Sequence, residues 1–141
     1  WLGTVLASVM ATARVNDADT QWTAWSPAAL ETGLEEGRPV LVDVTADWCV
    51  TCKANKALVL DRAPVASALA AAVAAGRLTL LRADWTRPDP DIAAFLAAHG
   101  RYGIPFNILL QPEGRSPVIL PELLTGSAVM AALEKAGVTA K

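Results

Sequence analysis

Cysteine and histidine are scarce in this chain of 141 residues. There are two cysteines, Cys49 and Cys52, and one histidine, His99. A single cysteine pair leaves no framework of structural disulfides and no second pair of thiol metal ligands. A structural zinc site takes about four ligands, and one histidine with no further cysteine argues against such a site. The cysteine count alone leaves the cellular compartment open.

Strong charge of one sign is also missing. The chain has 12 basic and 14 acidic residues, a formal net charge of −2, and these residues are dispersed along the sequence. Nucleic-acid-binding domains usually carry a basic patch, and charged disordered tails carry a block of one sign. The composition therefore gives no case for nucleic acid as a partner. The length suits one domain with a sizeable core.

Residues 1–13 lack charge altogether and are mostly apolar. A membrane-spanning helix needs about 20 apolar residues, so this segment cannot span a bilayer by itself. Three interpretations stay open: the end of a membrane helix that begins upstream, the tail of a signal peptide cleaved near Ala11-Thr12-Ala13, or an apolar helix of the domain. We assign residues 1–21 to this segment and a polar linker, and residues 22–141 to the domain itself.

One stretch carries chemistry. An apolar, β-branched run from Val40 to Val44 suits a buried strand, and Lys53 to Leu60 has the composition of a helix. Between them, Cys49 would lie at the helix N-terminus, where unpaired N–H groups and the helix dipole favour a thiolate. Cys52 follows about one helical turn later, close enough for a disulfide. This arrangement predicts a dithiol redox centre in which Cys49 is the exposed nucleophile and Cys52 resolves the mixed disulfide.

The segment Val42–Lys53 resembles the active-site segment of the thioredoxin superfamily. Within that superfamily it is most similar to the C-terminal domain of the DsbD and ScsB-like thiol:disulfide interchange proteins. Further matches follow in the same order at Leu81–Thr86, Gly103–Pro105 and Leu120–Thr125. The resemblance covers roughly residues 22 to 137, which is far more specific than a lone Cys-x-x-Cys.

The expected elements agree with that resemblance. We expect strands over 40–44, 78–83, 106–110 and 118–120, and helices over 28–36, 53–60, 65–75, 91–99 and 125–136. A helical crossover should make the first two strands parallel, and a tight turn should make the last two antiparallel. The predicted class is α/β: a thioredoxin fold with a four-stranded mixed sheet flanked by helices, preceded by an extra N-terminal helix.

Asp43 lies within the apolar strand, on the face opposite to Val42 and Val44. A buried carboxylate is costly unless it is paired or protonated, and desolvation should raise its pKa. Beneath the cysteines it could accept the proton of Cys52 when that thiol becomes the attacking thiolate. Related proteins place an acid at this position. The alternative is an edge-exposed aspartate without a role.

Other residues near the motif have weaker signals. Trp48 can cover the disulfide and offer a partner an apolar contact, although packing explains it equally well. Ile104-Pro105 matches the cis-proline element of the family, whose backbone can receive a substrate segment as an added strand. His99 fits a helix C-cap better than a catalytic role. Lys56 stands where related domains often carry glutamate, so we assign it no role.

The resemblance implies a disulfide reductase domain on the periplasmic side of the inner membrane, at the C-terminus of a membrane protein. Its dithiol would take electrons from a membrane-embedded cysteine pair and pass them to a periplasmic disulfide-containing protein or domain. The cysteines carry both electrons, so no cofactor or metal is expected. Two alternatives stay open: a disulfide oxidase or isomerase, which differs in reduction potential, and a module for Cu(I) or another soft metal. The lack of a nearby methionine or histidine argues against the second.

Overall fold

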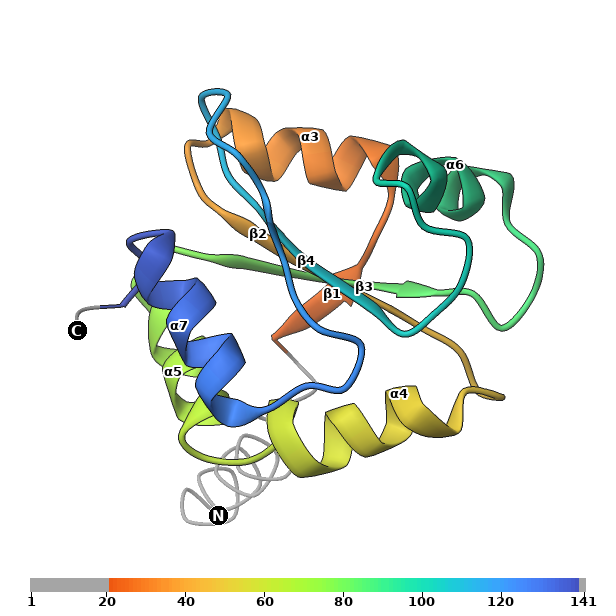
Figure 1. Ribbon diagram of the computed structural model, residues 1–141. Helices are drawn as coiled ribbons and strands as arrows, with labels where there is room; N and C mark the ends of the chain where they lie inside the picture. Colours follow the sequence, from red (N-terminus) through yellow and green to blue (C-terminus); the bar gives the residue numbers. More distant parts are fainter. Residues whose placement is uncertain (1–20, 140–141) are drawn as a thin grey trace, which may run out of the picture.

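The computed structural model describes residues 21–139, which form a mixed sheet with helices on both faces (Figure 1). The sheet has five strands in the order β1-β3-β2-β4-β5. The strands are β1 (Trp22–Ala24), β2 (Val40–Thr45), β3 (Thr79–Asp84), β4 (Phe106–Leu110) and β5 (Val118–Ile119). The central strand β2 is parallel to β3 and antiparallel to β4, and β5 is antiparallel to β4. The predicted parallel first half and antiparallel second half are confirmed.

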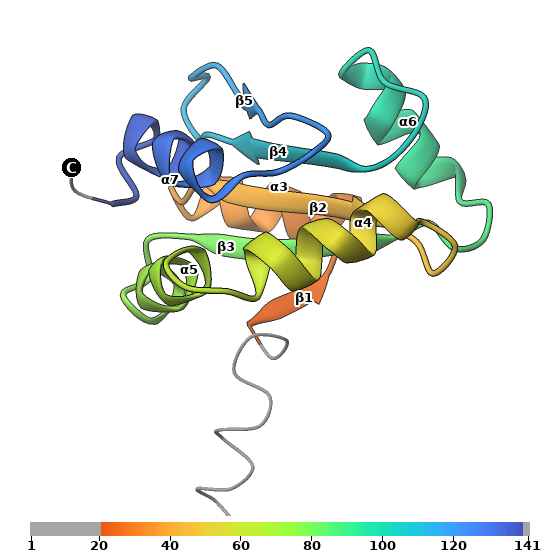
Figure 2. The same cartoon turned by 60° about the horizontal axis from the view of Figure 1, so that its bottom comes forward.

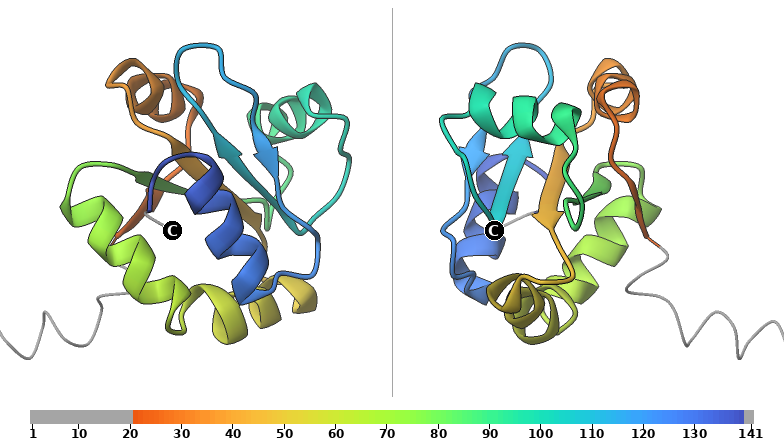
Figure 3. Two further views of the ribbon diagram at one scale, coloured as in Figure 1. Left: turned by 60° about the vertical axis from the view of Figure 1, so that its left-hand side comes forward. Right: turned by 90° about the vertical axis from the view of Figure 1, so that its right-hand side faces the viewer.

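Two groups of helices cover the sheet, one on each face (Figures 2 and 3). The first group is α3 (Pro27–Glu35) and α6 (Pro90–Ala98); the second is α4 (Val50–Asn55), its π-helical continuation η1 (Lys56–Leu60), α5 (Val65–Ala74) and α7 (Gly126–Lys135). Local sequence explains where they begin. The Ser26 hydroxyl accepts the Ala29 N–H at 3.0 Å, with a proline at the first helical position of α3. This is the cap predicted from Ser26-Pro27.

The alternation of side chains along β2 divides the core in two. Val40, Val42 and Val44 pack with α3 and α6, whereas Leu41 packs with α5 and α7 on the opposite face. Asp43 shares the face of Leu41 because successive residues of a strand point to opposite sides. The aspartate therefore lies on the face that α4 covers.

The sheet has one strand more than predicted. The extra strand, β1, is three residues long and pairs with β3, with Trp22 opposite Leu80. Three residues are too few to show an alternating pattern, which is why the sequence does not reveal it. Helix α4 begins at Val50, directly after Cys49, as the predicted place of Cys49 at a helix N-terminus requires. The fold class and the helix that precedes the central strand are as predicted.

The apolar segment at residues 1–13 lies outside the described residues, so its three interpretations stay predictions. Within residues 21–139, no single helix is both long and apolar enough to cross a bilayer. The stretches Val50–Leu60 and Val65–Ala74 meet that requirement only when taken together, and they are bent by 76° at the break between them.

Candidate active site

Cys49 and Cys52 form a disulfide at the start of α4, with their Cα atoms 5.3 Å apart. Cys49 is the N-cap of the helix, and its Sγ accepts a hydrogen bond from the backbone N–H of Cys52 at 3.1 Å. In the dithiol form, the same N–H can donate to a Cys49 thiolate and so favour the ionised sulfur. The predicted place of Cys49 at the helix N-terminus is confirmed.

Both cysteines are buried, with exposed fractions of 6% for Cys49 and 4% for Cys52. Ala46 and Ile104 pack against them. The expectation that Cys49 is an exposed residue is therefore wrong for this disulfide form. Because the two exposures are so similar, the roles of the cysteines rest on the N-cap position of Cys49 and not on accessibility.

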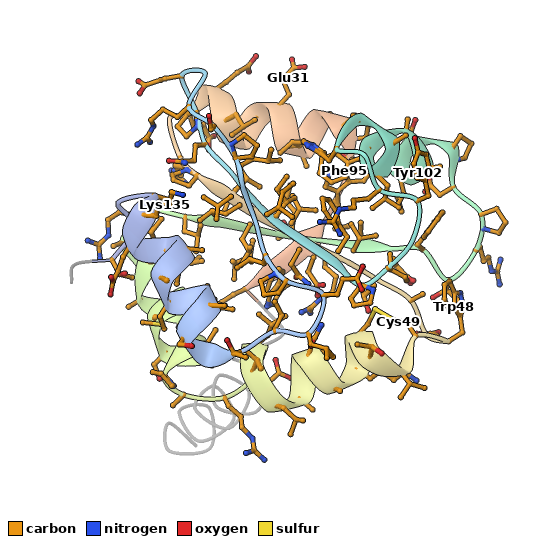
Figure 4. All side chains as sticks on the ribbon, in the orientation of Figure 1. Glu31, Trp48, Cys49, Phe95, Tyr102 and Lys135 are labelled. Carbon is orange, nitrogen blue, oxygen red and sulfur yellow. A yellow bond between two sulfur atoms is a disulfide. The ribbon has the colours of Figure 1, made fainter. Side chains whose placement is uncertain are left out.

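An open groove with a volume of about 440 Å³ lies beside the disulfide. Its lining consists of Trp48, Trp85, Thr86, Pro88, Tyr102 and Gly103. The residues Trp48 and Tyr102 are 60% and 82% exposed. Figure 4 shows Trp48 next to Cys49 at the start of α4, with Tyr102 on the segment that follows α6. The groove is thus an aromatic surface that adjoins the reactive disulfide.

Hydrogen bonds hold the turn before the disulfide in place. The Trp48 Nε1–H donates to the Thr86 carbonyl at 3.2 Å, and the Asp47 N–H donates to the Thr86 hydroxyl at 2.9 Å. The neighbouring Ile104–Pro105 peptide bond is cis, as predicted. A second cis bond, at Ala63–Pro64 between η1 and α5, has no signal in the sequence.

Asp43 is 5% exposed and forms an ion pair with Arg82 of β3, whose Nε lies 3.0 Å from Oδ2. The Arg82 guanidinium also lies over the Trp22 ring, 4.2 Å from its centroid. Burial raises the pKa of the Asp43 carboxyl, and Arg82 opposes that rise through its charge and its hydrogen bond. The predicted burial and raised pKa are confirmed, and the pairing with Arg82 is a feature that the sequence did not reveal.

Lys56, for which the sequence predicts no role, acts on the Asp43 carboxyl through its charge. Its Nζ is 2.7 Å from Oδ2 of Asp61. The Lys56 ammonium lowers the pKa of Asp43, and the Asp61 carboxylate raises it. A cleft of about 270 Å³ is lined in part by Lys56 and Arg82. Its other lining residues are Thr45, Ala46, Asp47, Lys53 and Asp84.

Asn55, one turn beyond Cys52, fixes α4 to the segment before α7. Its Nδ2 donates to the Glu122 carbonyl at 2.7 Å, and its Oδ1 accepts the Leu124 N–H at 3.0 Å. Asn55 is 5% exposed, so both bonds lie away from water. This residue was missed in the sequence, although a polar side chain three positions after a buried cysteine would face inward on a helix.

The structure brings several of the predicted site residues together. Cys49, Cys52 and Ile104 are in contact, and Trp48 borders the groove beside them. His99, for which the sequence predicts no catalytic role, is the C-cap of α6 as predicted, with its ring centroid 5.0 Å from that of Phe95. Within residues 21–139, no group of three or more His, Cys, Asp or Glu side chains is placed to hold a metal ion.

Comparison with known proteins gives a consistent set of relatives. A family model described as thioredoxin-like matches residues 21–112. The thiol:disulfide interchange protein DsbD of Ralstonia nicotianae is 34% identical over 114 residues, which cover 80% of this chain and 18% of that protein. DsbD 1 of Pseudomonas aeruginosa is 34% identical over 93 residues, 63% of this chain and 15% of that protein. The chain therefore spans less than a fifth of these curated relatives.

Two solved structures are similar along nearly their whole length. The oxidised form of the DsbD C-terminal domain of Neisseria meningitidis has a TM-score of 0.63 and 27% identity, covering 81% of this chain and 98% of that one. The reduced form of the same domain has a TM-score of 0.62 and 25% identity, covering 81% and 99%.

Proposed function

The chain belongs to the thioredoxin-like family, and on that premise we propose that it is the protein-disulfide reductase domain of a DsbD-type thiol:disulfide interchange protein. The observation that carries the proposal is the Cys49–Cys52 disulfide at the N-cap of α4. The similarity to both redox forms of a DsbD C-terminal domain supports it. The domain would lie on the periplasmic side of the inner membrane, where a membrane-embedded cysteine pair reduces it.

In the proposed reaction, the Cys49 thiolate attacks one sulfur of a partner disulfide and forms a mixed disulfide. The other partner sulfur leaves as a thiolate and takes a proton from water. Cys52 then gives its proton to the Asp43 carboxylate and attacks the Cys49 sulfur, which releases the second partner thiolate. That thiolate takes up a proton from water, and the Asp43 carboxylic acid returns its proton to water. The partner gains two electrons and ends as two thiols, and Cys49 and Cys52 end as the disulfide of the structure.

The partner segment would dock where the groove meets Ile104. A cysteine-bearing strand placed along the backbone of Ile104 would bring its sulfur to the disulfide. The side chain beside that cysteine would enter the groove between Trp48 and Tyr102, and an apolar or aromatic residue fits this lining best.

We expect Trp48→Ala and Tyr102→Ala each to raise KM for a partner protein about 5- to 30-fold, equivalent to about 1–2 kcal/mol of lost contact. The value of kcat should change little, because neither ring takes part in the proposed proton transfer from Cys52 to Asp43. Leu58→Ala is a matched control, since Leu58 is as exposed as Trp48, at 60%, but lies on η1 outside the groove. Equal KM values for all three variants and the parent would place docking elsewhere.

The test of the function itself is the reduction potential of the Cys49–Cys52 pair, measured at equilibrium against glutathione. A reductase should lie nearer to the value of about −270 mV typical of thioredoxin than to the value of about −120 mV of the oxidant DsbA. A potential at the oxidising end would favour the disulfide oxidase or isomerase. A dithiol that binds Cu(I) tightly but reduces no protein disulfide would favour the metal-handling alternative.

A further inference from the structure

Asn107 of β4 has a buried side-chain carboxamide that makes no hydrogen bond within the described residues. The residue is 2% exposed, and neither Oδ1 nor Nδ2 has a hydrogen-bond partner among the residues that the structure describes. Its backbone carbonyl accepts the Leu120 N–H at 2.9 Å, but any residue would supply that carbonyl. Because a buried polar group without a partner costs free energy, an apolar side chain would suit this position better for stability alone.

The sheet places Asn107 next to the proton acceptor of the proposed reaction. In the register of β2 and β4, Asn107 is directly opposite Asp43, and on the other side of Asp43 lies Arg82 of β3. These residues form a polar row across the central strands, on the face that α4 covers. The next row on this face is Leu80, Leu41 and Leu109, all part of the apolar core.

In this row Asp43 lies between Arg82 on β3 and Asn107 on β4, so Asn107 is its neighbour on the β4 side. Directly opposed residues have Cβ atoms about 4.5–5.5 Å apart, so a rotation of the carboxamide can bring it to the carboxyl. Arg82 already binds Oδ2 of Asp43, which leaves Oδ1 for a second partner. A carboxamide can donate through Nδ2 to a carboxylate and accept through Oδ1 from a carboxylic acid.

We propose that Asn107 is a positioning residue of the redox site, whose carboxamide hydrogen-bonds Asp43 while that carboxyl receives and releases the proton of Cys52. The proposal rests on the proposed function. In the disulfide form Cys52 cannot react, so the hydrogen bond between Asn107 and Asp43 is not needed. This explains why the Asn107 amide is left without a partner in that form. Asn107 has no charge and acts on the carboxyl by hydrogen bonding alone.

Several charged groups also act on Asp43, and the test must separate them from Asn107. Arg82 from β3 and Lys56 from η1 favour the carboxylate, whereas burial and Asp61 favour the acid. Cys52 of α4 is the proton donor. Because a hydrogen bond to an ionised group is roughly twice as strong as one between neutral groups, the Asn107 amide favours the carboxylate on balance.

The test is Asn107→Leu, which keeps the approximate volume and removes both polar atoms. Reduced protein is mixed with 5,5′-dithiobis(2-nitrobenzoate), and the two releases of thionitrobenzoate report attack by Cys49 and resolution by Cys52. We expect the pH midpoint of the second step to rise by about one unit, with resolution about tenfold slower on the acid side of that midpoint. The first step should stay within about twofold.

Three comparisons make the result specific. Asn107→Ser keeps a donor and an acceptor and should lie nearer to the parent than Asn107→Leu does. Ile108→Leu changes the opposite face of β4, in the other core, and should leave the midpoint unchanged. Asp43→Asn should remove the pH dependence that Asn107 is proposed to tune. A parent-like midpoint in Asn107→Leu, or equal midpoints in the leucine and serine variants, would overturn the proposal.

Reduction of a partner disulfide by the parent protein, assayed beside the release of thionitrobenzoate, separates this proposal from the proposed function. If the function is wrong, the parent protein already fails to reduce a partner disulfide. If only the inference about Asn107 is wrong, the parent reduces its partner and all three β4 variants share its pH profile. Asn107→Leu should in addition unfold at a higher denaturant concentration than the parent, since a buried amide without a partner is gone.

Discussion

Replacing Cys49 with serine is expected to abolish disulfide reduction, whereas replacing Cys52 with serine is expected to trap a covalent complex with the partner protein. Without Cys49 there is no thiolate at the N-cap of α4, and the rate should fall by several orders of magnitude, to the uncatalysed background. Without Cys52 the first attack still proceeds, but nothing displaces the partner from Cys49. Non-reducing gel electrophoresis and mass spectrometry of the adduct give the readout.

This experiment decides an assignment that burial leaves open. The exposed fractions of Cys49 and Cys52 are nearly equal, at 6% and 4%. The assignment of Cys49 as the attacking sulfur therefore depends on its hydrogen bonding at the N-cap and not on its accessibility. Cys49→Ser/Cys52→Ser is the control and should give no adduct. If Cys49→Ser traps the partner and Cys52→Ser does not, the two roles are reversed.

The sequence predicts the redox site well where chemistry is encoded in neighbouring residues. The turn from β2 into α4 brings Trp48, Cys49 and Cys52 together within a few positions, and their relation can be predicted from helix geometry alone. The cis bond at Ile104–Pro105 lies far away in the chain, and its prediction depended on the family resemblance. Local spacing says little about which distant residues face the motif across a sheet.

Residues that strand pairing places side by side are the hardest to relate to one another from the sequence. Arg82 and Asn107 each interrupt an apolar strand with a polar side chain, which is the same signal that made Asp43 stand out. The sequence does not show the register of the strands, so only the pairing of β2 with β3 and β4 reveals that the three residues form one row.

Breaking the ion pair of that row on the Arg82 side should lower the stability of the domain near neutral pH. Replacing Arg82 with methionine leaves the Asp43 carboxylate buried without its main partner, and we expect the free energy of unfolding to fall by about 2–3 kcal/mol at pH 7. We expect a loss below the roughly 3–5 kcal/mol of a typical broken buried pair, because Lys56 still lowers the pKa of Asp43. Urea denaturation with the disulfide intact measures the loss.

The pH dependence of this loss follows from the direction of the Asp43 pKa. The folded pKa lies above the ordinary value of 3.8, so the folded state holds the proton more tightly than the unfolded chain does. Stability therefore falls as pH rises from the unfolded pKa through the folded pKa. Arg82→Met should raise the folded pKa further and extend this decline, so that the variant is close to the parent near pH 4 and weakest at neutral pH.

Asp43→Asn should restore the lost stability when it is combined with Arg82→Met. Asparagine keeps the shape of the protonated acid and carries no charge to desolvate, so the double variant should recover most of the 2–3 kcal/mol, while Asp43→Asn alone should be at least as stable as the parent at pH 7. The decline with pH should also disappear, because the titrating group is gone. If the double variant is instead less stable than Arg82→Met, the methionine disrupts packing around Trp22, and the charge of Asp43 is not what Arg82 offsets.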